Sequence, residues 1–72
     1  MMEKERLKKL GLNLKVERTR KELTQDELAA KAGSSKNYIG SIERGIQNPS
    51  ITKVIDIAAA LEIDINTLIE NV

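Results

Sequence analysis

The sequence of 72 residues contains no cysteine, histidine, tryptophan or phenylalanine, and it has one tyrosine and one proline. Without cysteine, no disulfide stabilises the chain and no thiolate binds a metal ion, and without histidine a metal site would have oxygen ligands alone. The serines have no evident general base, the carboxylates are scattered, and no glycine-rich phosphate loop is present. We therefore expect no enzymatic activity and no cofactor.

Long apolar runs are also missing. The longest, Ile57 to Leu61, falls far short of the roughly 20 residues that cross a bilayer, and no signal peptide pattern is present. We expect a soluble, cytoplasmic protein with no membrane partner. The length fits one domain, residues 1–72, whose stability comes from helix packing or oligomerisation.

The net charge is only +1, but the charges are unevenly distributed. Residues 1–21 contain eight Lys or Arg and three Glu, which gives +5, whereas residues 22–72 contain four Lys or Arg and eight Asp or Glu, which gives −4. A basic part joined to an acidic part indicates one surface that meets a polyanion. A solvated, charge-rich first helix would give the same pattern.

Helix signals recur along the chain, while strand signals are almost absent. Leu7, Leu10 and Leu14 are spaced as one face of a helix, in which Gly11 is either a weak point or a close-packing site. Capping and turn residues then divide the rest of the chain. The expected helices are a first from about Lys4 to Lys21, a second after the capping box of Thr24 and Glu27 to about Ala32, a third capped by Ser34 or Ser35 and closed by Gly45, a fourth from about Ile51 to Glu62, and a short fifth after Asp64. The expected fold class is therefore all-α.

The second and third of these helices are spaced as a helix-turn-helix over about residues 25–44. Ala29 provides a small side chain where two steeply crossed helices come closest, and Gly33 tolerates the positive φ of a short turn. Ile39 and Ile42, three residues apart, turn one side of the third helix toward the core.

These residues also carry a family resemblance. Gln25, Ala29, Gly33, Ile39 and Ile42 match, in type and spacing, the helix-turn-helix of the phage repressor and Cro family, also called xenobiotic-response-element-like regulators. Three flanking segments resemble the family too: LTQDELAAKAG, YIGSIERG and NPSITKVIDIAAALEID. The resemblance covers about residues 10–70 and implies a compact five-helix bundle that binds double-stranded DNA.

Two positions depart from the family pattern. Glu22 and Glu62 stand where relatives often have glycine, so we expect these turns to be slightly strained or their helices to end differently.

In a protein of this shape the third helix lies in the major groove. Lys donates to guanine and Asn bonds adenine with two hydrogen bonds, so Lys36 and Asn37 are the expected main base readers. Gly40, expected on the outward face, would let the backbone approach the groove wall or a thymine methyl. The full set of expected base contacts is Ser35, Lys36, Asn37, Gly40 and Ser41. The alternatives are that Lys36 meets only phosphate and that Ser35 only caps the helix.

A second set is expected to contact phosphates without reading sequence. It consists of Gln25, Tyr38, Arg44, Gln47 and Asn48. For Gln25 the resemblance implies this role, while Tyr38 is equally well a half-buried packing ring. The resemblance also implies a structural salt bridge between Arg18 and Glu43, which would hold the third helix on the first.

The C-terminal segment has more apolar residues than a short final helix easily buries. We expect Leu68, Ile69 and Val72 to form the interface of a homodimer on a palindromic operator, the alternative being that all of them are core. The expected function is a transcriptional regulator, a repressor, and the competing function is a protein-interaction module of the same fold. Because no ligand-sensing domain is present, no small-molecule ligand is expected.

Overall fold

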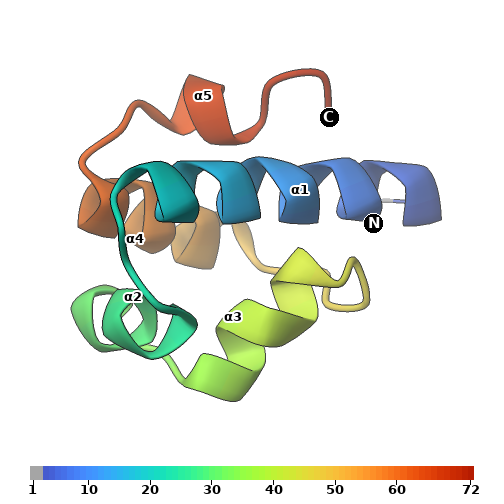
Figure 1. The fold of residues 1–72 in the computed structure, drawn as a ribbon. Coiled ribbons are helices and arrows are strands. Elements are labelled where there is room, and N and C mark those ends of the chain that lie inside the picture. Colours follow the sequence, from blue (N-terminus) through green and yellow to red (C-terminus); the bar gives the residue numbers. More distant parts are fainter. Residues whose placement is uncertain (1–2) are drawn as a thin grey trace.

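The structure is a computed structural model that describes residues 3–72, and over these residues it contains five helices and no strand. The helices are α1 (Lys4–Arg20), α2 (Gln25–Ala32), α3 (Lys36–Glu43), α4 (Ile51–Leu61) and α5 (Ile65–Leu68). The long helix α1 lies across the middle, with α5 on one side and the α2–α3 pair on the other (Figure 1). The predicted all-α, five-helix fold is confirmed. No helix among residues 3–72 combines the length and the apolar character that crossing a membrane needs.

Each helix after α1 begins at a side chain that accepts a hydrogen bond from a free backbone amide. At α2 the Thr24 hydroxyl accepts from the Glu27 amide at 3.0 Å, and the Glu27 carboxylate accepts from the Thr24 amide at 2.8 Å. The hydrogen bond from the Thr24 backbone amide, and next the Thr24 side chain, hold the pKa of the Glu27 carboxyl below its ordinary value. The other caps are Ser35, Ser50 and Asp64. The capping residues therefore set the helix starts near the positions expected from the sequence.

Two glutamates occupy a backbone conformation that glycine adopts more easily. Glu22 and Glu62 both have a φ of 57°, in the left-handed region. Glu62 caps the end of α4, where its amide donates to the Ala59 carbonyl at 3.0 Å. This conformation costs a residue with a Cβ roughly 1–2 kcal/mol. Of the two outcomes expected where relatives have glycine, a strained turn or a different helix end, the strained turn is found at both positions.

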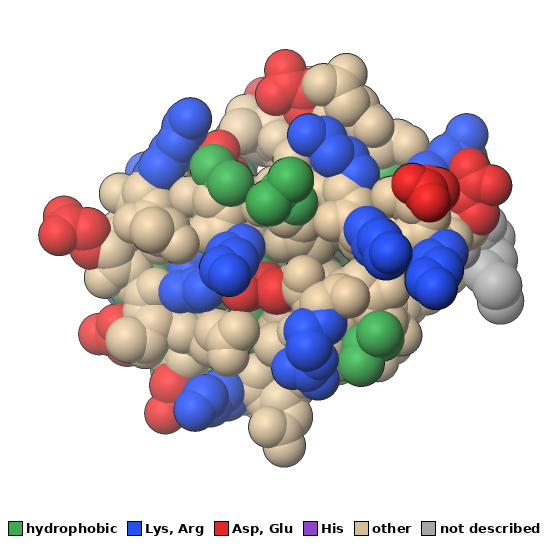
Figure 2. All heavy atoms as spheres, turned by 45° about the vertical axis from the view of Figure 1, so that its right-hand side comes forward, with side chains coloured by type: hydrophobic (Ala, Val, Ile, Leu, Met, Phe, Trp, Pro, Cys, Tyr) green, Lys and Arg blue, Asp and Glu red, His purple; other side chains and the backbone are tan. Residues whose placement is uncertain are grey.

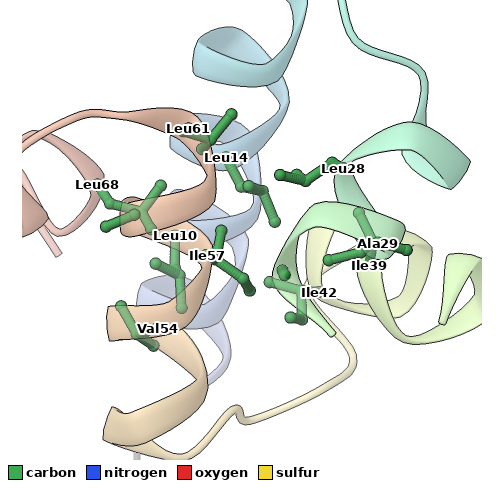
Figure 3. Packing of buried hydrophobic residues seen from close by; sticks show 12 residues of the cluster. Leu10, Leu14, Leu28, Ala29, Ile39, Ile42, Val54, Ile57, Leu61 and Leu68 are labelled. Atoms are coloured by element: carbon green, nitrogen blue, oxygen red, sulfur yellow. The ribbon is translucent and has the colours of Figure 1, made fainter. Parts of the chain in front are cut away.

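The core is filled by aliphatic side chains from all five helices (Figure 3). Leu10 and Leu14 of α1 belong to this cluster, and Ile39 and Ile42 face inward as predicted. The buried set is Leu10, Leu14, Leu28, Ala29, Ala32, Ile39, Ile42, Val54, Ile57, Ala58, Leu61 and Leu68.

The C-terminal segment differs from the prediction. Leu68 is only 1% exposed and belongs to the core, so its assignment to a dimer interface is wrong. Asn13 of α1 holds the segment in place, because its side-chain amide donates to the carbonyls of Leu68 and Glu70, both at 2.9 Å. Val72 is half-buried against the core, and Ile69 remains 39% exposed. The alternative of core packing therefore holds for Leu68, while Ile69 is left at the surface.

Candidate nucleic-acid interface

Helix α3 presents its first turn to solvent. Lys36 and Asn37 are both exposed there. The Ser35 hydroxyl accepts a hydrogen bond from the Tyr38 amide at 3.1 Å, so Ser35 caps the helix, as its alternative interpretation held. Ser41 is half-buried and its hydroxyl donates to the Tyr38 carbonyl at 2.7 Å, which leaves its oxygen lone pairs as acceptors. Of these four residues, Ser35 and Ser41 each make a hydrogen bond within the helix, whereas Lys36 and Asn37 present exposed side chains.

Gly40 is buried, so the expectation of an open, outward position is wrong. A Cβ atom built on Gly40 would stand 3.2 Å from Nη1 of Arg44 and 3.5 Å from Oε1 of Gln25. The ends of these two polar side chains lie over the glycine and shield it from solvent. Gly40 thus provides the space in which Gln25 of α2 and Arg44 at the end of α3 come together.

A half-buried ion pair holds α3 on α1. Arg18 Nε donates to Glu43 Oε2 at 2.6 Å and Nη2 donates to Oε1 at 3.1 Å, a two-pronged contact. The side chains are 13% and 4% exposed, and the hydrogen bond to Glu43 raises the pKa of the Arg18 guanidinium above its ordinary value. Arg18 also donates to the Leu23 carbonyl at 2.7 Å, so the pair predicted from the resemblance is tied to the α1–α2 turn as well.

Gln25 extends this network to α2. Its Nε2 donates to Glu43 Oε1 at 3.1 Å, so one carboxylate receives hydrogen bonds from α1 and from α2. This contact could not be predicted from the sequence, because Gln25 and Glu43 are far apart along the chain and only the crossing of α2 over α3 brings them together. The amide of Gln25 is held beside Gly40 and near the exposed side of α3.

The remaining expected contacts lie around the end of α3 and the turn that follows. Arg44 and Asn48 are exposed, Gln47 is half-buried, and Gly45 has a left-handed φ of 74° that turns the chain. Tyr38 is half-buried and packs against the core, as its alternative interpretation held. Lys and Arg side chains gather on one face of the molecule (Figure 2). Within residues 3–72 no group of acidic side chains is arranged to hold a metal ion.

Comparison with known proteins also identifies a helix-turn-helix. The family model HTH_3, described as helix-turn-helix, matches residues 14–68. The transcriptional regulator SinR of Bacillus subtilis is 40% identical over 62 residues, which are 85% of this chain and 56% of SinR. This chain therefore spans little more than half the length of that relative.

Two solved structures have the same fold as this chain. The restriction-modification controller protein C.AhdI of Aeromonas hydrophila superposes with a TM-score of 0.85 at 39% identity, covering 86% of this chain and 94% of that one. SinR, the master regulator for biofilm formation, superposes in its complex with DNA with a TM-score of 0.80 at 40% identity, covering 85% and 98%.

Proposed function

This chain belongs to the helix-turn-helix family HTH_3, and we propose that it is a sequence-specific double-stranded DNA-binding transcriptional regulator that acts as a repressor. One observation carries the proposal: α3 offers an exposed first turn with Lys36 and Asn37 while its other side is fixed to α1 and α2. A fixed helix with free polar side chains is what readout of base edges requires, because the donors must hold their positions against the groove. The structure of the relative SinR in complex with DNA supports the same function.

The first turn of α3 is proposed to read bases in the major groove. Lys36 would donate to O6 and N7 of guanine, and Asn37 would bond N6 and N7 of adenine with two hydrogen bonds. Ser41 would accept through its free lone pairs, and the capping hydroxyl of Ser35 would add a donor. Gly40 contributes no base contact in this proposal, because it is covered by Gln25 and Arg44.

Phosphate contacts are proposed for the polar groups on either side of this turn. Gln25 lies at the first position of α2, where free backbone amides and the helix dipole favour an anion. Arg44, Gln47 and Asn48 follow the end of α3 and would meet the DNA backbone there. The Tyr38 hydroxyl, from the first turn of α3, is proposed to contact a phosphate as well. Such contacts fix the register of the protein on the duplex.

A homodimer on a palindromic operator is the proposed assembly. One recognition helix reads only a few base pairs, and two copies would place their helices about 34–36 Å apart. With Leu68 in the core, the interface is proposed to keep Ile69 and the half-buried Val72. Ile51 and Ile55, which are exposed on the neighbouring helix α4, are proposed to extend it. Sedimentation of the wild type and of Ile55→Glu tests this assembly. A wild-type monomer at high micromolar concentration would contradict it.

The function itself is tested by selecting duplexes from a random library and measuring their mobility shifts as salt rises. We expect a preferred half-site, steep loss of affinity with salt, and loss of discrimination worth about 1–3 kcal/mol at one base pair in Asn37→Ala. Asn66→Ala, at an exposed position on α5, is the matched control and should bind like the wild type. If no duplex is selected and none is retarded, the protein-interaction module becomes the better function.

A further inference from the structure

Two aliphatic side chains on α1 serve neither the core nor the proposed DNA contacts. Leu12 is 53% exposed and Val16 is 39% exposed, whereas Leu10 and Leu14 beside them are buried. Residues four apart lie on the same side of a helix, so Leu12 and Val16 form one apolar patch. Aliphatic area left in water gives no stability to the folded chain, which makes the patch available for another contact.

The patch lies in a shallow hollow on the surface of α1. The lining consists of Leu12, Lys15, Val16, Thr19 and Arg20. Figure 2 shows neighbouring hydrophobic side chains with Lys and Arg side chains around them on one face of the molecule. The hollow therefore has an apolar floor and a rim of cations.

The charged groups that line the hollow are cations. They are Lys15 and Arg20, and no carboxylate lines it. Glu17 lies 3.6 Å from Arg20 and offsets part of its charge, but the Glu17 side chain is only 12% exposed. The exposed groups beside the hollow thus attract carboxylates more than they attract cations.

The apolar floor and the cationic rim allow three candidate partners for the hollow to be compared. A second copy of α1 would bring two basic helices together, and such like-charge contact costs several kcal/mol. DNA would engage the cations but leave Leu12 and Val16 without an apolar partner. An amphipathic helix with acidic flanks matches both the apolar floor and the cations at its rim, and it would pack on this one side of α1.

We propose that the Leu12–Val16 hollow docks the apolar face of an acidic amphipathic helix from a partner protein. The helix turns about 100° per residue, so Leu12 and Val16 lie on a different side of α1 from Gly11 and Arg18, which face α3. The partner thus docks while α3 is engaged with DNA. This surface is independent of the proposed base and phosphate contacts.

The probe is a synthetic helical peptide of about 18 residues, long enough to form a helix, with leucines spaced three and four apart and glutamates on the flanks. It is titrated into the isotopically labelled protein while backbone amide shifts are recorded. We expect shifts centred on residues 12–20 that saturate at low salt and weaken as salt rises. A peptide of the same composition with its leucines scattered around the helix is the control, and it should cause no saturable shift.

Two sets of variants assign the contact. Leu12→Gln with Val16→Gln removes the apolar floor without changing charge and should weaken binding by about tenfold, while Ile46→Gln, at another exposed aliphatic position, should not. Lys15→Glu keeps the floor and should also weaken binding, which separates docking from any folding defect of the double variant. Operator binding should be unchanged in the double variant.

Several results would overturn the proposal. They are equal shifts from the scattered-leucine peptide, shifts centred on α3 instead of α1, no saturable shift at about 1 mM peptide, or attraction of residues 12–20 to phosphatidylglycerol vesicles with no peptide binding.

Discussion

A Cβ atom built on Gly11 would stand 2.7 Å from the carbonyl oxygen of Glu43 and closer still to that of Ile42. The backbones of α1 and α3 therefore touch at this glycine, which makes Gly11 a close-packing site. The contact lies next to the Arg18–Glu43 pair, so the same crossing is held by packing and by charge.

Gly11→Ala should lower the free energy of unfolding by about 1–3 kcal/mol, because the new methyl group meets backbone that has no room to move. The sign of this change separates the two effects of the substitution. Helix propensity alone would raise the free energy of unfolding by about 1 kcal/mol, because alanine is favoured over glycine in a helix. Urea unfolding followed by circular dichroism measures the change. A variant as stable as the wild type would show that α1 and α3 separate more easily than their packing indicates.

Gly40→Ala should have the opposite effect on stability. Its Cβ would stand 3.2 Å from Nη1 of Arg44, the far end of a flexible side chain, so the fold gains up to about 1 kcal/mol of helix propensity. Operator affinity should fall, because the end of the Arg44 side chain would have to shift to make room for the methyl group. Equal affinity for a selected duplex would rule out that positioning role.

Glu43→Ala should destabilise the fold by up to roughly 3–5 kcal/mol, since it leaves Arg18, whose side chain is only 13% exposed, without its carboxylate. Thermal and urea unfolding provide the measurement. Glu3→Ala is the matched control, because the Glu3–Arg6 pair is long, at 3.8 Å, and exposed, and such pairs are worth about 0–1 kcal/mol. A loss no greater than that of the control would mean that the half-buried pair contributes nothing net.

Glu62→Gly should raise the free energy of unfolding by about 0.5–1 kcal/mol, because glycine adopts the left-handed conformation without the penalty of a Cβ. Glu62→Ala removes the same charge but keeps the Cβ, so it should not stabilise. If both variants stabilise equally, the effect comes from charge and not from backbone strain.

The capping box predicts a pH dependence. The pKa of Glu27 is lowered from 4.5 in the folded chain, so the unfolded chain binds a proton more readily at acidic pH. The contribution of Glu27 to stability is therefore present above about pH 4.5 and is lost as the pH falls through the folded pKa. Melting temperatures at neutral and acidic pH should differ less in Glu27→Gln than in the wild type. An unchanged difference would show that other carboxylates dominate acid unfolding.

Several features of this protein could be predicted from the sequence because they depend on residues close together in the chain. The capping box of Thr24 and Glu27, the turn at Gly33 and the inward face of Ile39 and Ile42 each involve separations of no more than four residues. Backbone hydrogen bonding and side-chain periodicity act over that range, so local sequence determines the helices and their inner faces.

Other features were decided only by the tertiary structure. Leu68 and Ile69 have the same apolar character, yet Leu68 packs into the core and Ile69 stays exposed, because Asn13 of α1 holds the segment in one orientation. Gly40 was expected on the outward face of α3, but Gln25, fifteen residues earlier, covers it. Such contacts depend on how distant helices cross, and neither periodicity nor capping specifies that crossing. The sequence by itself determined a helix-turn-helix, while the crossing of its helices decided which side chains remain free to bind.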